Sequence, residues 1–443
     1  MRSIFFKMEI KIDLRLQLKV QYIENTMATT ITTTMVNITV DANRKPNAIS
    51  LFSGCGGDTL GLENAGFSVI AFNEFKQWAK ETHLANFPHS VSLTDSKGKS
   101  DITKLPDSVF EEFTGDTKID VVFAGFPCQG FSTAGKKNTT DPRNQLFRQF
   151  VRVVKITKPS FLIGENVSGL LSMKSGPRQE DPLMIEIIRE AFREIGYTIS
   201  YRVLEAVRFG VPQSRKRILI VGWLSTLSVD SEKLWDTILE WGTQRPMVSM
   251  DSFIQKTLEG AHKLDARAIP PDFDTVAVQI PDNVSISGSP HSYVTLKATS
   301  FGETYNEKTY DRLLSCGKRD SPIHSEVLNV RVPCKTIICT YDHQPRLLVG
   351  LKNTSGSYVR CLLPDELKQI QGFPTNFQLK GTVKEQIIQV GNAVPPPLVE
   401  GIARQLLLLL KGFRDAAQPV VVETVEEKVV ATKRRVLKKK ATQ

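Results

Sequence analysis

Between residues 48 and 221, short apolar runs alternate with stretches of helical pattern, and this alternation constrains the fold more than any other feature of the chain. Five runs have the length and composition of buried strands. They occupy residues 48–52, 68–72, 119–124, 161–163 and 217–221. Strands joined by helices predict an α/β fold with a doubly wound, largely parallel sheet. Because ligands bind at the carboxyl ends of such strands, we expect the functional residues directly after these runs.

The rest of the sequence divides into segments around this first domain, which we place at residues 47–223. Residues 1–46 are expected to form an extension outside the core. Residues 224–357, with many Pro, Gly, Ser and Asp residues, predict a smaller, loop-rich second domain. Residues 358–410 return to the first domain and end in a helix that starts at Pro396 and stops at Leu410. Residues 411–443 form a basic tail that we expect to be disordered.

Charge and cysteine content limit the classes of protein that fit. The net charge of +10 is concentrated at the ends, since residues 411–443 alone carry nine Lys or Arg against four Asp or Glu. The basic end of the tail, residues 433–440, is a candidate nuclear address or DNA tether. The six cysteines form no C-x-x-C pair, so we expect no metal site and reduced thiols in an intracellular protein. No apolar run reaches membrane-spanning length, and we expect no membrane contact.

The first apolar run leads into a glycine-rich loop, and the second ends at a carboxylate. Residues 52–57 read Phe-Ser-Gly-Cys-Gly-Gly, and such glycines let the backbone turn tightly and approach a ligand. The G-x-G-G spacing differs from the dinucleotide fingerprint. Glu74 is placed to accept hydrogen bonds from ribose hydroxyls, and Phe75 to cover an adenine whose far side meets Asp101 and Ile102. A strand-to-helix turn without a ligand is the alternative interpretation.

The third and fourth runs end at a cysteine and a glutamate. Residues 125–132 read Gly-Phe-Pro-Cys-Gln-Gly-Phe-Ser and put Cys128 on a loop at the carboxyl edge of the sheet. Glu165 follows the fourth run at the same edge. A single cysteine is usually structural, and a glutamate can simply pair with a nearby arginine. The two together favour a reactive site.

A cytosine ring explains why a thiol and a carboxyl group would be needed together. Carbon 5 of cytosine is too weak a nucleophile to take a methyl group directly, but a thiolate added at carbon 6 creates electron density at carbon 5. The addition places charge on ring nitrogen 3, which Glu165 can neutralise if burial raises its pKa. A base inside a duplex must first swing out of the stack. These residues therefore predict Cys128 as nucleophile and Glu165 as acid.

Two basic segments are candidates for contact with a nucleic acid. Residues 130–146 have the composition of a mobile lid that could hold phosphates. Its cations are Lys136, Lys137 and Arg143. Before the fifth run, Arg215 and Arg217 are expected to project from one side and Lys216 from the other. One of these arginines could neutralise the base or its phosphate through the paired N–H donors of its guanidinium group. A solvated loop and an ordinary charge run are the alternatives.

Taken together, these motifs resemble the DNA cytosine-5 methyltransferase family across residues 48–410. The resembling blocks occur in the family's order, which chance would rarely produce. They are the cofactor loop at 52–57, the ribose acid at 73–75, the adenine-side aspartate at 100–103, the nucleophile at 127–129, the acid at 165–167, the basic motif at 213–217 and the closing pair at 371–374 and 391–395. Cys55 departs from the pattern, since an apolar residue is more usual there.

The resemblance implies S-adenosylmethionine as methyl donor, duplex DNA as substrate, activity as a monomer and a target recognition domain at 224–357. It also assigns roles by block. The catalytic residues would be Cys128, Glu165 and Arg215. The cofactor-binding residues would be Phe52, Gly54, Cys55, Gly56, Gly57, Glu74, Phe75, Asp101, Ile102, Pro127, Leu146 and Asn392. The DNA-contacting residues would be Gln129, Ser132, Lys136, Lys137, Arg143 and Arg217.

Three alternatives stay open at this point. A tRNA-directed branch of the same family shares these blocks, although residues 125–132 are more similar to the DNA branch. A catalytically silent nucleic-acid-binding relative is a second alternative, and the presence of Cys128, Glu165 and Arg215 argues against it. A nicotinamide-dependent dehydrogenase is a third, weakened by the missing G-x-G-x-x-G spacing.

Overall fold

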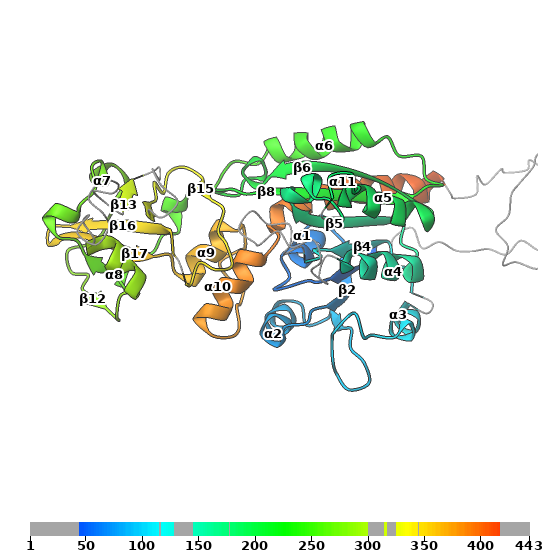
Figure 1. Ribbon diagram of the computed structural model, residues 1–443, viewed down its shortest axis with the longest axis horizontal. Coiled ribbons are helices and arrows are strands. Elements are labelled where there is room, and N and C mark those ends of the chain that lie inside the picture. The colour runs from blue at the N-terminus through cyan, green and yellow to red at the C-terminus, as the bar shows by residue number, and fades with distance from the viewer. Residues whose placement is uncertain are drawn as a thin grey trace, which may run out of the picture. The chain divides into compact units, whose positions relative to one another are not determined.

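The apolar runs of the first half form a seven-stranded sheet in the order β3-β2-β1-β4-β5-β8-β6 (Figure 1). Its strands are β1 (Asn47–Leu51), β2 (Ser68–Asn73), β3 (Val91–Ser92), β4 (Val121–Ala124), β5 (Phe161–Val167), β6 (Tyr197–Glu205) and β8 (Lys216–Leu224). The computed structural model describes residues 44–114, 117–127, 145–176, 178–299, 314–316, 325–343 and 345–416. They all belong to one unit, Ala42–Gln443. The expected fold class is confirmed, and each of the five expected runs is a strand.

One strand runs against the others. Strands β1 to β5 pair in parallel, whereas β8 is antiparallel to both of its neighbours, β5 and β6. The start of β8 therefore lies at the same edge of the sheet as the ends of β1, β4 and β5. This reversal brings residues that precede β8 to the edge where ligands bind in doubly wound sheets.

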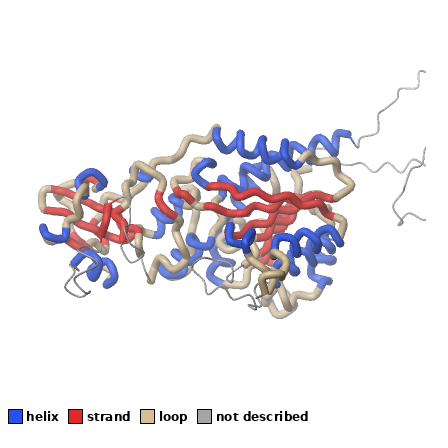
Figure 2. Tube along the Cα trace, turned by 45° about the horizontal axis from the view of Figure 1, so that its top comes forward, coloured by secondary structure: helices blue, strands red, loops and turns tan. Residues whose placement is uncertain are grey.

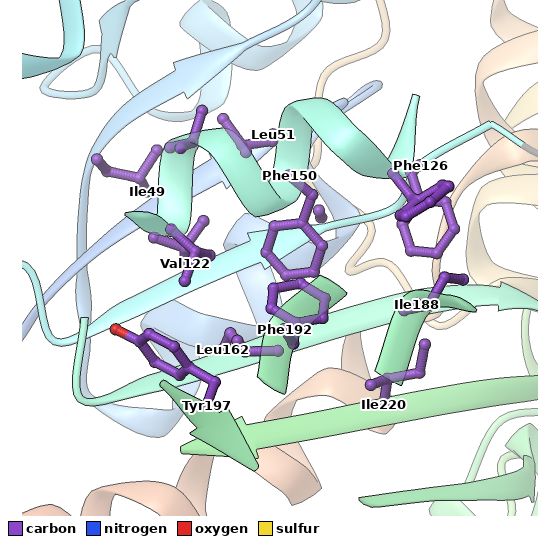
Figure 3. Close-up of a cluster of buried hydrophobic side chains, with 14 of the residues drawn as sticks. Ile49, Leu51, Val122, Phe126, Phe150, Leu162, Ile188, Phe192, Tyr197 and Ile220 are labelled. Carbon is purple, nitrogen blue, oxygen red and sulfur yellow. The ribbon is translucent and has the colours of Figure 1, made fainter. Parts of the chain in front are cut away.

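Helices cover both faces of the sheet, as the red strands between blue helices show in Figure 2. One face carries α3 (Asp107–Thr114), α4 (Phe147–Thr157) and α5 (Met184–Glu194), and the other carries α1 (Gly57–Ala65), α6 (Ser231–Thr243) and α11 (Pro396–Ala416). Alternate residues of each strand feed the two cores: on β4, Val122 faces the first set of helices and Phe123 the second. In the first core, the rings of Phe150 and Phe192 meet edge to face at 5.1 Å (Figure 3).

The loop-rich region folds around a second sheet of six strands. Its main path is β10-β17-β16-β14-β13, with β11 paired to β16. The strands are β10 (His262–Lys263), β11 (Val278–Gln279), β13 (Leu314–Cys316), β14 (Ser325–Val327), β16 (Leu347–Asn353) and β17 (Gly356–Cys361). Short helices α7 (Phe273–Val276) and α8 (Ser292–Thr299) and the pair β9 (Leu258–Glu259) with β12 (Ile286–Ser287) complete it. Most strands are too short to show a period in the sequence.

Two elements extend across the boundaries expected for this second region. Helix α6, which follows residue 224, packs Leu234, Trp235 and Ile238 into the core of the first sheet. At the other end, β17 continues past residue 357 to Cys361. Three more helices, α2 (Gln77–Asn86), α9 (Pro364–Ile370) and α10 (Val383–Asn392), lie near the glycine-rich loop at residues 52–57 and the closing motifs.

The last helix also extends further than the sequence indicated. Expected to stop at Leu410, α11 continues to Ala416. The added turn is held by tertiary contacts: the Phe413 ring lies 6.4 Å from that of Phe161, and Arg414 pairs with Asp120 at 2.7 Å. Within the described residues, no single helix is long and apolar enough to cross a membrane, and only α10 and α11 taken as a bent pair have the length and composition to do so.

Candidate active site

The glycine-rich loop after β1 has a backbone that few residues other than glycine adopt. Phe52, Gly54 and Gly56 have φ angles of 55°, 54° and 90°. A Cβ on Gly56 would lie 2.7 Å from the Phe87 ring, and one on Gly57 would lie 2.3 Å from the Val394 carbonyl oxygen. A side chain at either glycine would therefore clash. The closing motif that contains Val394 packs directly on the loop.

The end of β2 fastens the same loop. The Glu74 carboxylate accepts hydrogen bonds from the backbone N–H of Gly54 at 2.9 Å and of Lys76 at 2.6 Å. Burial raises the pKa of Glu74, and these hydrogen bonds act in the opposite direction. Phe75 stands out from the surface with 65% of its area exposed. The end of β2 thus places an exposed aromatic ring directly after a carboxylate that is held by two backbone N–H groups.

A hollow of about 290 Å³ opens beside Phe75. Its lining residues are Phe75, Gln77, Asp95, Gly98, Lys99, Ser100, Asp101 and Lys104. Asp101 accepts hydrogen bonds from the Thr103 backbone and hydroxyl, which fix its carboxylate at the rim. Ile102, only 4% exposed, belongs to the hydrophobic core beneath. The structure thus brings Phe75 and Asp101 to one hollow, while the Ile102 side chain is turned inward.

The side chain of Cys55 also points away from the loop surface. It is 1% exposed and packs with Phe87, Phe373 and Phe377. Burial raises the pKa of this thiol to about 12, so it stays protonated and inert. Any contact of Cys55 with a ligand is therefore limited to its backbone. This packing also explains why an apolar residue could stand at the position.

Glu165, at the end of β5, lies in a buried ion pair. Its Oε1 atom is 2.8 Å from the Nε atom of Arg217, and the two side chains are 11% and 13% exposed. Burial raises the pKa of Glu165, while Arg217 and Arg215 act to lower it. The next residue, Asn166, donates a hydrogen bond to the Phe126 carbonyl at 3.0 Å and so ties β5 to the loop that follows β4. The sequence did not single out this role of Asn166.

Arg215 and Arg217 have different surroundings. Arg217 faces Glu165, whereas Arg215 is 2% exposed and donates to the carbonyls of Ile337 at 2.9 Å and Gly391 at 3.0 Å. Lys216 between them is exposed, which confirms the expected alternation. Burial lowers the pKa of Arg215, and Arg217 adds to that effect. Arg215 thus holds two backbone segments together, and Arg217 is the arginine that faces the acid.

A network of glutamines continues from Arg215. Gln213 in β7 (Gln213–Ser214) donates to the side chain of Gln371 at 2.5 Å and accepts from the backbone N–H of Ile337 at 2.9 Å. Gln371 in turn donates to the carbonyl of Ala393 at 2.7 Å. Strand β7 also pairs with β15 (Cys334–Lys335). The basic motif and both closing motifs are therefore parts of one buried network.

Several residues expected from the sequence lie at the margin of the described structure or outside it. Pro127 follows β4 and is half-buried, Leu146 precedes the first turn of α4 and is half-buried, and Asn392 is exposed at the end of α10. Outside the described residues lie Cys128, Gln129, Ser132, Lys136, Lys137 and Arg143, and also residues 433–440 of the tail.

A buried acid near the site was missed by the sequence reasoning. Asp58, in the first turn of α1, is 3% exposed and accepts a hydrogen bond from the hydroxyl of Ser50 on β1. The available signal was a serine inside an apolar run and an aspartate directly after the glycine loop. Among the described residues, no group of His, Cys, Asp and Glu is arranged to hold a metal ion.

Comparison with known proteins agrees with this geometry. Residues 47–408 match the family model of C-5 cytosine-specific DNA methylases. The chain is 32% identical to the type II methyltransferase M1.HphI of Haemophilus parahaemolyticus, over 81% of this chain and 86% of that protein. It is 30% identical to M.DdeI of Desulfomicrobium norvegicum, over 81% and 88%.

Solved structures share the fold. A putative DNA modification methyltransferase from an E. coli prophage superposes with a TM-score of 0.56 at 24% identity, over 82% of this chain and 99% of that one. The Dnmt2 methyltransferase of S. pombe superposes with a TM-score of 0.53 at 16% identity, over 83% and 99%. With the family match across most of its length, the chain belongs to the C-5 cytosine-specific DNA methylase family and is a DNA (cytosine-5) methyltransferase.

Proposed function

We propose that the protein transfers a methyl group from S-adenosylmethionine to carbon 5 of a cytosine flipped out of duplex DNA, with Cys128 as covalent nucleophile and Glu165 as acid. The observation that carries the proposal is the buried pair of Glu165 and Arg217 at the sheet edge, beside the strand end that leads to Pro127. Burial raises the pKa of this carboxyl group, which favours its acid form, and the adjacent N–H donors of Arg217 can bind the same base.

The loop after β1 fits the methyl donor. Ser53 Oγ and Thr59 Oγ1 are buried and have no hydrogen-bond partner within the described part of the chain. A Cβ on Gly54 would meet nothing within 4 Å, so a ligand has open space above the loop. Glu74 and Phe75 would hold the ribose and adenine, with Asp101 at the rim. When bound, S-adenosylmethionine would supply an activated methyl group on a positively charged sulfur.

The residues of the chain would carry the remaining steps. The Cys128 thiolate would bond to carbon 6 while the Glu165 proton goes to nitrogen 3. Carbon 5 would then use the resulting electron pair to bond the methyl carbon, and the electrons of the broken methyl carbon–sulfur bond would stay with the donor. Carbon 5 then loses its proton to solvent base. The Cys128 sulfur leaves with its bonding electrons, and the nitrogen 3 proton returns to Glu165, which restores the aromatic ring.

We assign Arg217 to the base and Arg215 to the scaffold, because only Arg217 faces Glu165. The region from about residue 244 to Cys361 would recognise the target sequence, with the monomer as the active form. Gln129, Ser132, Lys136, Lys137 and Arg143 would contact DNA from the lid. Leu146, Pro127 and Asn392 would border the donor.

The test is transfer of label from S-adenosylmethionine to duplex DNA and to tRNA, for the wild-type protein and for Cys128→Ala. We expect labelled DNA, unlabelled tRNA and no turnover in the variant. Bisulfite sequencing of DNA from expressing cells would read the target site in the same experiment. Preferential labelling of tRNA would favour the RNA-directed alternative, and undiminished turnover by Cys128→Ala would contradict covalent catalysis.

A further inference from the structure

The segment between β3 and α3 forms one wall of the hollow beside Phe75, and it lies outside strands and helices. Buried backbone carbonyls in such an irregular segment need hydrogen-bond donors from other elements. Four of them, at residues 93, 100, 102 and 105, accept hydrogen bonds from side chains on β2 and α4. These side chains therefore decide how firmly the wall of the hollow is held.

Arg152 on α4 makes two of these hydrogen bonds. Its guanidinium group donates to the Ile102 carbonyl at 2.7 Å and to the Leu105 carbonyl at 2.9 Å. The same group pairs with Asp107, the first residue of α3, at 2.8 Å and lies 5.4 Å from the centre of the Phe110 ring. A planar guanidinium can hold several acceptors at once in a fixed geometry. Arg152 thus joins α4 both to the wall of the hollow and to α3.

The turn that Arg152 holds begins at Asp101. The Asp101 backbone carbonyl accepts hydrogen bonds from the N–H groups of Lys104 at 2.8 Å and Leu105 at 3.2 Å, which closes the turn. On the other side, the buried side-chain amide of Asn73 at the end of β2 donates to the Ser100 carbonyl at 3.0 Å. The Asp101 turn is therefore fixed from two directions, by β2 and by α4.

We propose that Arg152 is a positioning residue for the methyl donor: it fixes the Asp101 turn, so that the hollow beside Phe75 keeps the shape that binds the adenosine end of S-adenosylmethionine. The inference rests on the proposed donor site. Arg152 is not among the described residues that line the hollow, so it acts through the backbone of the turn. A site that is already in shape loses less conformational freedom when its ligand binds, and this raises affinity.

The first experiment measures binding of S-adenosylmethionine to the full-length protein by titration calorimetry. Arg152→Ala should weaken binding about tenfold, while the single-turnover rate of methyl transfer at saturating donor stays within about twofold of the wild-type rate. Arg152→Lys keeps the charge and can reach one carbonyl, so it should recover part of the lost affinity. Lys155→Ala removes an exposed cation from the same helix and is the matched control, with unchanged donor affinity.

A double variant tests whether Arg152 acts through the Asp101 turn. Asp101→Ala removes the carboxylate that the turn presents at the rim of the hollow, and it should itself weaken donor binding. In that background, Arg152→Ala should weaken binding by less than about twofold further, because residues that act through one contact are not additive. Equal effects of Arg152→Ala with and without Asp101 would overturn the inference, as would undiminished donor affinity in Arg152→Ala.

A second measurement needs no donor. Hydrogen exchange followed by mass spectrometry should show faster exchange of the backbone amides at residues 104 and 105 in Arg152→Ala than in the wild-type protein, with α5 unchanged. Unchanged exchange at these two amides would overturn the role of Arg152 on its own. If the wild-type protein binds no S-adenosylmethionine, the proposed function fails, and the exchange result still decides whether Arg152 holds the turn.

Discussion

At the scale of single residues, the surroundings of Glu165 decide its chemistry. Burial raises its pKa, and the arginines at 217 and 215 limit that rise. The contact with Arg217 also aims the carboxyl group, since one guanidinium nitrogen lies 2.8 Å from Oε1. The sequence placed this glutamate at the sheet edge correctly, and it left pairing with an arginine open as an alternative. The structure contains both features at once.

Replacing this acid should separate proton transfer from binding. We expect Glu165→Gln to lower the rate of methyl transfer by about a hundredfold to ten-thousandfold, the usual contribution of a general acid, because glutamine cannot give up a proton. In the wild-type protein the rate should fall as pH rises. Burial raises the pKa of Glu165, and the carboxyl group holds its proton below that pKa and loses it above. The rate of methyl transfer and the affinity for S-adenosylmethionine would both be measured. A variant as fast as the wild-type protein would contradict the role of Glu165.

At the scale of secondary structure, the direction of β8 assembles the site. A parallel strand in that position would carry its preceding residues to the opposite edge, away from the ends of β4 and β5. Because β8 is antiparallel, Arg217 pairs across from Val167 and lies beside Glu165. The same reversal presents Arg215 to Ile337 and Gly391, which belong to segments far along the chain.

Loss of the Arg215 side chain should therefore weaken the fold more than the loss of an exposed arginine. Arg215→Ala removes the donors to two buried carbonyls and creates a cavity. We expect a loss of about 3 kcal/mol in the free energy of unfolding. Arg208→Ala, at an exposed position in the preceding turn, is the control and should change it by less than about 0.5 kcal/mol. Urea denaturation measures both. Equal stability of the two variants would show that Arg215 does not hold these segments together.

At the scale of the whole molecule, one buried carboxylate joins both ends of the described chain. Asp120 is fully buried and accepts from Arg44 at 2.6 Å, from the Asn47 backbone at 2.8 Å and from Arg414 at 2.7 Å. Arg414 also donates to the Arg44 carbonyl at 3.1 Å. The last turn of α11 thus belongs to the folded body.

Two truncations test where the body ends. A chain that stops after Ala416 should unfold at the same urea concentration as the full-length protein. A chain that stops after Leu410 loses Phe413 and one of the two arginines of Asp120, and we expect it to be less stable by about 3 kcal/mol or more. The two chains differ by only six residues, so each is the control for the other. Equal stability would show that the last turn contributes nothing.

The parts of the fold that the sequence predicted are those with local signals. The five apolar runs became β1, β2, β4, β5 and β8. Strand β6 was missed because Thr198, Ser200 and Arg202 interrupt its apolar residues, as is common for a strand at the edge of a sheet. The strands of the second region were missed because most span only two or three residues and depend on non-local pairing.

The sequence by itself determined the fold class, the family resemblance and the order of the motifs, because apolar periodicity and turn-forming glycines act between near neighbours. Only the tertiary structure decided that β8 runs backward, that Arg217 and not Arg215 faces Glu165, and that Asp58 and Asp120 are buried. These features depend on contacts between residues as much as 294 positions apart, as for Asp120 and Arg414. Burial and charge pairing are completed only when distant segments meet.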